Sequence, residues 1–120
     1  MSLRVVDHKP AVVTTTDATT TTLLSWEIPD NSSAYVEASI VGKDSSGNTA
    51  SRKVSACVKR VSGTASMVGT VQLIVPLIAD AALLTVVMTM DVSSPVVRVR
   101  VTGIISTTIE WFCMFEILNT

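Results

Sequence analysis

The sequence has few charged residues: Asp, Glu, Lys and Arg make up 16% of the chain, and its formal net charge is -1. An ordinary soluble domain carries roughly 25% charged residues, so a monomer of this chain would have little charge to spread over its surface. The chain also lacks the basic excess that is typical of nucleic-acid-binding proteins. We therefore expect no nucleic-acid partner, and we expect other subunits to cover part of the surface.

Residues that commonly carry catalysis or bind metals are also scarce. His8 is the only histidine, and no Cys or His lies near it at the spacing of a metal site. No serine has the flanking glycine pattern of a nucleophile elbow, and a single histidine would have to serve any catalytic triad. We therefore predict that the protein is not an enzyme, and that it has no metal, no cofactor and no small-molecule substrate.

Two cysteines, Cys57 and Cys113, are the only candidates for a disulfide. The N-terminal residues do not form a signal peptide, and the longest apolar stretches are too interrupted to span a membrane. The sequence thus predicts a soluble protein made in the cytoplasm, where two free thiols acting as small core residues are favoured over a disulfide. Aromatic residues, at 4% of the chain, are too few to build the platform of a sugar-binding module.

What the sequence does contain is an excess of β-branched residues. Val, Thr and Ile together make 43 of 120 residues, and they are densest in the stretch 12–22. Such side chains lose rotamer freedom on a helix and pack well on the pleated surface of a sheet. The composition therefore predicts an all-β protein, and the length is that of one domain.

Turn signals divide the chain into about eight strands at the spacing of a small β-sandwich. After an irregular N-terminal arm (1–10), the predicted strands cover 11–16, 19–28, 34–43, 51–61, 66–75, 83–92, 96–102 and 107–118, with a short helical turn at 77–82. Pro76 cannot donate a ladder hydrogen bond, so it should end its strand or lie on a sheet edge. We predict a single-domain antiparallel β-sandwich, jelly-roll-like, over residues 11–120.

The last predicted strand is apolar on both of its faces. One face carries Trp111, which we place near the centre of the core, whereas the other carries Phe112 and Met114 and needs a second cover. The predicted core comprises Val36, Ile40, Val54, Val58, Val97, Val99, Val101, Ile109, Trp111 and Phe115. We expect an obligate oligomer, most simply a homotrimer. The expected oligomer or capsid interface comprises Leu3, Val5, Val6, His8, Phe112 and Met114.

Three short motifs resemble a small β-rich domain of tailed-bacteriophage virion proteins. They occur in the order that is seen in that domain, and the resemblance covers about residues 12–117. The first is Thr14-Thr15-Thr16-Asp17-Ala18-Thr19 followed by Thr22-Leu23, the second is Lys59-Arg60-Val61-Ser62-Gly63-Thr64, and the third is Val101-Thr102-Gly103 followed by Thr107-Thr108-Ile109 and Trp111. The chain departs from the family in the hydrophobic stretch 73–90, where the family is more polar.

The resemblance implies membership of a virion, because such domains are similar to capsid decoration proteins and to pieces of tail fibres. We favour a capsid decoration (cement) protein on the capsid surface, which stabilises the head by bridging major capsid protein subunits. The arm (1–10) would be held by those neighbours. The alternative is a tail-fibre or receptor-binding head module, and a hydrolase-associated β-sandwich module is a more distant possibility.

Overall fold

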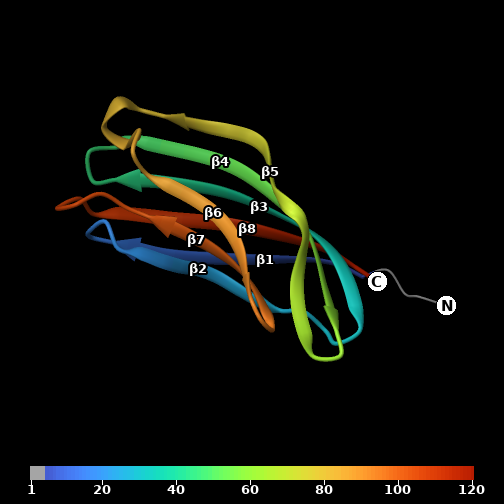
Figure 1. Ribbon diagram of the computed structural model, residues 1–120. Coiled ribbons are helices and arrows are strands. Elements are labelled where there is room, and N and C mark those ends of the chain that lie inside the picture. The colour runs from blue at the N-terminus through green and yellow to red at the C-terminus, as the bar shows by residue number, and fades with distance from the viewer. Residues whose placement is uncertain (1–4) are drawn as a thin grey trace.

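The computed structural model describes residues 5–120 as eight β-strands and one short 3-10 helix (Figure 1). The elements are β1 (Val5–Thr15), β2 (Thr20–Glu27), β3 (Ser32–Asp44), β4 (Thr49–Val61), β5 (Thr64–Ala79), η1 (Ala81–Leu83), β6 (Val87–Ser93), β7 (Val96–Thr102) and β8 (Ile109–Asn119). A five-stranded antiparallel sheet has the order β1-β8-β3-β4-β5, and a three-stranded antiparallel sheet has the order β2-β7-β6. The predicted all-β sandwich of about eight strands is confirmed.

Strands from the beginning of the chain pair with strands from its end. The first strand pairs with the last, and the second pairs with the seventh, as the corresponding strands of a jelly roll do. The third strand pairs with the fourth and not with the sixth, so the expected jelly-roll topology is present only in part. Between them, β3, β4 and β5 form a meander, and η1 leads the chain to β6 in the other sheet. The molecule is elongated, with extents of 51 × 23 × 21 Å. No helix among residues 5–120 has the length and hydropathy to cross a membrane.

The N-terminal arm is not irregular from Val5 onward, so this expectation is corrected. Residues 5–10 belong to β1, which runs beside β8 from the pair Val5 and Asn119 to the pair Thr15 and Ile109. The reason is that β8 extends far enough to offer hydrogen-bond partners to these residues. Pro10 is tolerated because β1 is an edge strand, where a missing N–H group need not interrupt a ladder. The predicted boundary at residue 10 therefore falls inside a strand.

The strand β5 also runs further than the sequence predicts. It continues past Pro76 to Ala79, and the helical turn follows at Ala81–Leu83 in place of 77–82. Because β5 is the other edge of the five-stranded sheet, Pro76 lies on an edge, which is one of the two positions expected for it.

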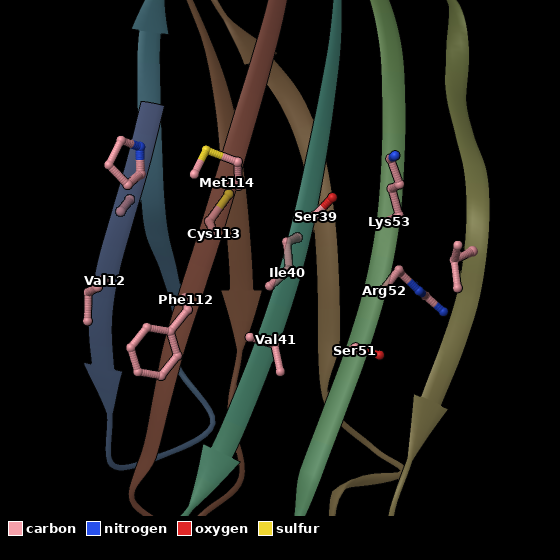
Figure 2. A pocket seen from close by; sticks show the side chains of 13 residues that line it. Val12, Ser39, Ile40, Val41, Ser51, Arg52, Lys53, Phe112, Cys113 and Met114 are labelled. Carbon is pink, nitrogen blue, oxygen red and sulfur yellow. The ribbon is translucent and has the colours of Figure 1, made fainter. Parts of the chain in front are cut away.

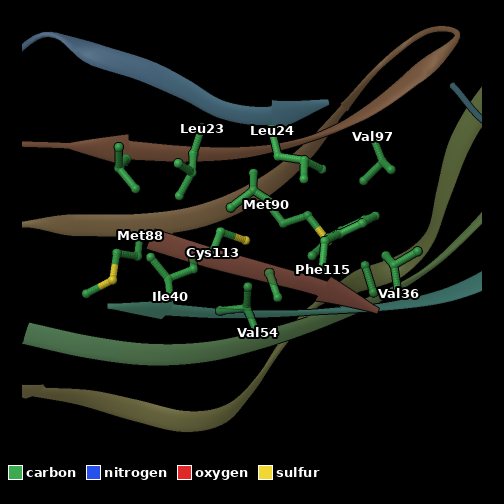
Figure 3. Packing of buried hydrophobic residues seen from close by; sticks show 14 of the residues in the cluster. Leu23, Leu24, Val36, Ile40, Val54, Met88, Met90, Val97, Cys113 and Phe115 are labelled. Atoms are coloured by element: carbon green, nitrogen blue, oxygen red, sulfur yellow. The ribbon is translucent and has the colours of Figure 1, made fainter. Parts of the chain in front are cut away.

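The core lies between the two sheets, and every predicted core residue is buried in it (Figure 3). Trp111, Ile109 and Phe115 of β8 are fully buried. The indole Nε1 of Trp111 donates a buried hydrogen bond of 2.9 Å to Oγ1 of Thr15 on the neighbouring β1. This bond satisfies the one polar atom of the largest core side chain.

Gly42 makes room for that indole from the other neighbouring strand. It is the cross-strand partner of Trp111 on β3, and a Cβ atom at this position would lie 2.7 Å from both Cε3 and Cζ3 of the ring. Glycine inside a strand is otherwise unfavourable, and it commonly marks a place where another group approaches closely. Here that group is the six-membered ring of Trp111.

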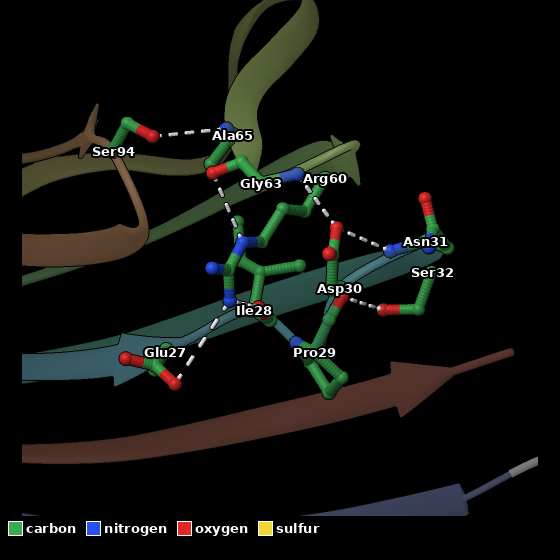
Figure 4. Close-up of polar contacts among 10 residues, drawn as sticks. All are labelled: Glu27, Ile28, Pro29, Asp30, Asn31, Ser32, Arg60, Gly63, Ala65 and Ser94. Atoms are coloured by element: carbon green, nitrogen blue, oxygen red, sulfur yellow. Dashed lines mark hydrogen bonds and ion pairs between the residues drawn. The ribbon is translucent and has the colours of Figure 1, made fainter.

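A network of polar contacts holds one end of the sandwich together (Figure 4). The Arg60 guanidinium on β4 donates to the carbonyl of Ile28 (3.0 Å) and to that of Gly63 (3.2 Å). The Asp30 carboxylate accepts a bond of 2.8 Å from the Gly63 backbone N–H. The turn after β2 is therefore fixed to the β4–β5 hairpin.

Candidate functional site

The outer face of the five-stranded sheet carries two neighbouring cross-strand rows that are rich in apolar side chains (Figure 2). From β1 to β5, the first row is Val12, Phe112, Val41, Ser51 and Ile78, and the second is Pro10, Met114, Ser39, Lys53 and Val75. A shallow hollow of about 580 Å³ lies over these rows. We name it the outer-face hollow and define it by Val12, Val41, Val75, Phe112 and Met114.

The hollow results from the alternation of β8. Odd-numbered residues from Ile109 to Ile117 point into the core, so Phe112 and Met114 are left on the outer face, where they are 39% and 42% exposed. Val12 of β1 and Val41 of β3 are the cross-strand partners of Phe112 on either side, and they are 65% and 38% exposed. The four side chains thus form one continuous apolar surface.

A polar row crosses the sheet beside the hollow. It consists of His8, Glu116, Glu37, Ser55 and Gln72. Glu37 and Glu116 are direct cross-strand partners, an unfavourable placement for two like charges. Two neighbours offset this repulsion at Glu37: the Tyr35 hydroxyl donates to Oε1 (2.7 Å), and Lys53 Nζ lies 3.3 Å from Oε2. The row can therefore accept hydrogen bonds from hydroxyl or amino groups of a partner.

The hydrogen bond from Tyr35, followed by the contacts with Lys53, lowers the pKa of Glu37 below its ordinary value of 4.5. A carboxyl whose pKa is lowered on folding contributes stability above that ordinary value, and the contribution is lost as the pH falls through the folded-state pKa. We expect the free energy of unfolding of Glu37→Gln to fall less than that of the wild type below pH 4.5. Urea titrations at several pH values measure this, with Glu110→Gln on the same sheet face as the control. Equal losses in the wild type and Glu37→Gln would contradict the prediction.

The structure brings together three of the six residues expected at an interface. Phe112 and Met114 lie in the outer-face hollow, and His8 lies exposed in the polar row opposite Glu116. Val5 and Val6 belong to β1, opposite Asn119 and Leu118. Leu3 lies outside the described residues. The interface role of these residues remains a prediction.

Sequence reasoning missed several residues of this face, namely Val12, Val41, Val75 and Glu37. Alternation along each strand indicates which residues share a face, and the motif Tyr35-x-Glu37 could have been noticed in that way. The adjacency of Glu37 to Glu116 and of Val12 to Phe112 depends on which strands pair, and no local pattern indicates that pairing.

Neither cysteine is in a disulfide, but only Cys113 is a core residue. Burial raises the pKa of the Cys113 thiol to about 12, whereas Cys57 is exposed. The expectation that Cys57 is a core residue is corrected, because Cys57 lies on the outer face of β4, in register with Tyr35. Within the described part of the chain, no three His, Cys, Asp or Glu side chains are placed to share a metal ion.

The chain matches no protein-family model and no curated protein. Among solved structures, it is similar to the crystal structure of the tailspike protein gp49 from Acinetobacter baumannii bacteriophage Fri1, a capsular polysaccharide depolymerase. The TM-score is 0.41 and the sequence identity is 17%, over 92% of this chain and 17% of the tailspike. The chain thus spans about a sixth of the length of that protein.

This comparison corrects one expectation. The prediction that the chain is not an enzyme is withdrawn, because the similar structure is itself an enzyme.

Proposed function

We propose that this chain is a structural module of a tailed-bacteriophage virion, that it is placed in the tail, and that it binds other virion subunits through its outer-face hollow. The observation that carries the proposal is the apolar exposure of the hollow, where Val12 is 65%, Phe112 39% and Met114 42% exposed. A continuous exposed apolar surface with a polar rim is the usual mark of a protein–protein interface. The motif resemblance between Thr14 and Trp111 supports the assignment to a virion.

A capsid decoration protein that bridges major capsid subunits is the second candidate. Its main support was an irregular arm (1–10) that only neighbouring subunits could order. Residues 5–10 instead take their order from pairing with β8 of the same chain, so they do not require a neighbour. With that support removed, a tail-fibre or receptor-binding position is preferred.

Electron microscopy of intact virions tests the proposal. The virions are those of the phage that encodes the chain, and they are labelled with gold-conjugated antibodies against it. We expect label on the tail. Label distributed over the head shell would favour capsid decoration, and virions without label would exclude both positions.

A depletion experiment provides the functional readout. Particles assembled without the chain should adsorb poorly to host cells, while their heads open at the same temperature as those of wild-type particles. Heads that open at a lower temperature, with normal adsorption, would favour decoration of the capsid.

A further inference from the structure

A second, smaller hollow adjoins the outer-face hollow along β8. It has a volume of about 240 Å³ and is lined by Tyr35, Glu37, Glu116, Ile117 and Leu118. Tyr35 is the cross-strand partner of Leu118, and Glu37 is that of Glu116. Because Glu116 follows Met114 by two residues, both side chains point outward from β8, and the two hollows are neighbours. We name this second hollow the acidic hollow.

The acidic hollow holds more negative than positive charge. Lys53 lies 3.3 Å from Glu37 and serves that carboxylate. Glu116 is exposed and forms no ion pair with any residue between 5 and 120. Like charges that lie directly opposite each other on neighbouring strands destabilise a sheet. Glu116 therefore lowers the stability of the fold, and a local rule broken in this way commonly marks a functional site.

A partner that covers the outer-face hollow at Met114 would also cover Glu116. Removing this carboxylate from water without a counter-ion would be strongly unfavourable, and so would bringing another carboxylate to it. A Lys or Arg side chain of the partner avoids both problems. Its charged end would lie between Glu37 and Glu116, and its apolar stem would pack on Leu118 and on the 41% exposed Tyr35.

Arg52, whose Nε has no hydrogen-bond partner, does not favour an acidic occupant instead. Arg52 is the cross-strand partner of Ile40, which is buried in the core. Its Nη1 donates to the Met88 carbonyl on β6 of the other sheet at 3.4 Å. The guanidinium therefore lies on the inner side of the five-stranded sheet, where a partner on the outer face does not reach it.

We propose that the partner at the outer-face hollow is an apolar segment of another virion subunit that carries a Lys or Arg side chain, and that this side chain binds in the acidic hollow at Glu116. The inference rests on the proposed function and states the chemistry of its partner. The apolar side chains of the segment lie over Phe112 and Met114, and its cation lies one cross-strand row further along β8.

One substitution should act on stability and on binding in opposite directions. Glu116→Lys removes the like-charge contact with Glu37, so the purified variant should unfold at a higher urea concentration than the wild type. The same variant repels the cation of the partner, so virions assembled with it should contain at most about a tenth of the wild-type number of copies. Glu116→Gln, which has no charge, should give an intermediate number. Circular dichroism follows unfolding, and quantitative immunoblots of purified virions count copies.

Two further variants make the test specific. The control is Glu27→Lys, which makes the same change of charge at a 69% exposed side chain of the other sheet. It should be incorporated like the wild type, because the exposed pair of Glu27 and Arg60, at 3.9 Å, contributes little to stability. Phe112→Ser removes an apolar contact from the outer-face hollow, so it should also be incorporated poorly.

Second-site suppressors of Glu116→Lys identify the cation. Mutations that restore incorporation of this variant should replace a Lys or Arg with Asp or Glu in another virion protein, because the charges at the contact would then again be opposite. Suppressors that lie only within this chain would contradict a partner cation at Glu116.

Other outcomes would also overturn the inference. Wild-type numbers of Glu116→Lys in virions would exclude a cation at Glu116, and yet gold label on the tail and a loss of Phe112→Ser would still support the proposed function. A lower urea midpoint for Glu116→Lys would show that its contact with Glu37 is not unfavourable. If Phe112→Ser is incorporated normally, the outer-face hollow is not the contact, and the proposed function fails as well.

Discussion

Replacing Trp111 with alanine should lower the free energy of unfolding by about 3 to 5 kcal/mol, the usual cost of removing a large aromatic side chain from a core. Trp111 is fully buried between the sheets, and strands on both sides of β8 are adapted to it. Alanine would leave a cavity above Gly42, and it would leave the buried Thr15 hydroxyl without the donor that now lies 2.9 Å away. Both losses act in the same direction.

Urea unfolding monitored by circular dichroism measures this loss. The control is Ile105→Ala, because Ile105 is 74% exposed and a surface truncation of this kind usually changes stability by at most about 0.5 kcal/mol. A Trp111→Ala variant as stable as this control would contradict the assignment of Trp111 to the core.

Adding a single methyl group at Gly42 should also destabilise the fold, by about 1 to 3 kcal/mol, which is typical of overpacking a core. The new Cβ atom would lie 2.7 Å from Cε3 and Cζ3 of Trp111 and 3.2 Å from Cγ2 of Ile109. The ring cannot move away easily, because Trp111 is fully buried and hydrogen-bonded to Thr15.

The cause of this effect can be isolated with a double variant. Phenylalanine lacks the two ring atoms that a Cβ at position 42 would meet, so Gly42→Ala should cost less in a Trp111→Phe background than in the wild type. Equal costs in the two backgrounds would show that the strain arises from the backbone of β3 and not from the indole.

Alternation along single strands was sufficient to predict the buried face of β8, the inward valines of β7 and the turn at Ser62-Gly63. These features depend on neighbours in sequence, and both turn residues have the positive φ values that a tight hairpin needs. Local patterns do not predict the pairing of β8 with both β1 and β3, because it joins residues 94 to 114 positions apart in the first case and 65 to 85 in the second. For the same reason, the sequence alone predicts an arm where residues 5–10 form part of β1, and no local pattern indicates the Glu37–Glu116 pair.

The pairing of Val5 with Asn119 places both ends of the described chain at one pole of the 51 Å long molecule (Figure 1). Hydrogen bonds between antiparallel strands run perpendicular to the strands. Tension applied between these two ends would therefore act along the bonds and separate β1 from β8 one pair at a time. Tension between this pole and the opposite one would load many bonds in parallel. The module should accordingly resist pulling along its length far better than pulling between its own ends.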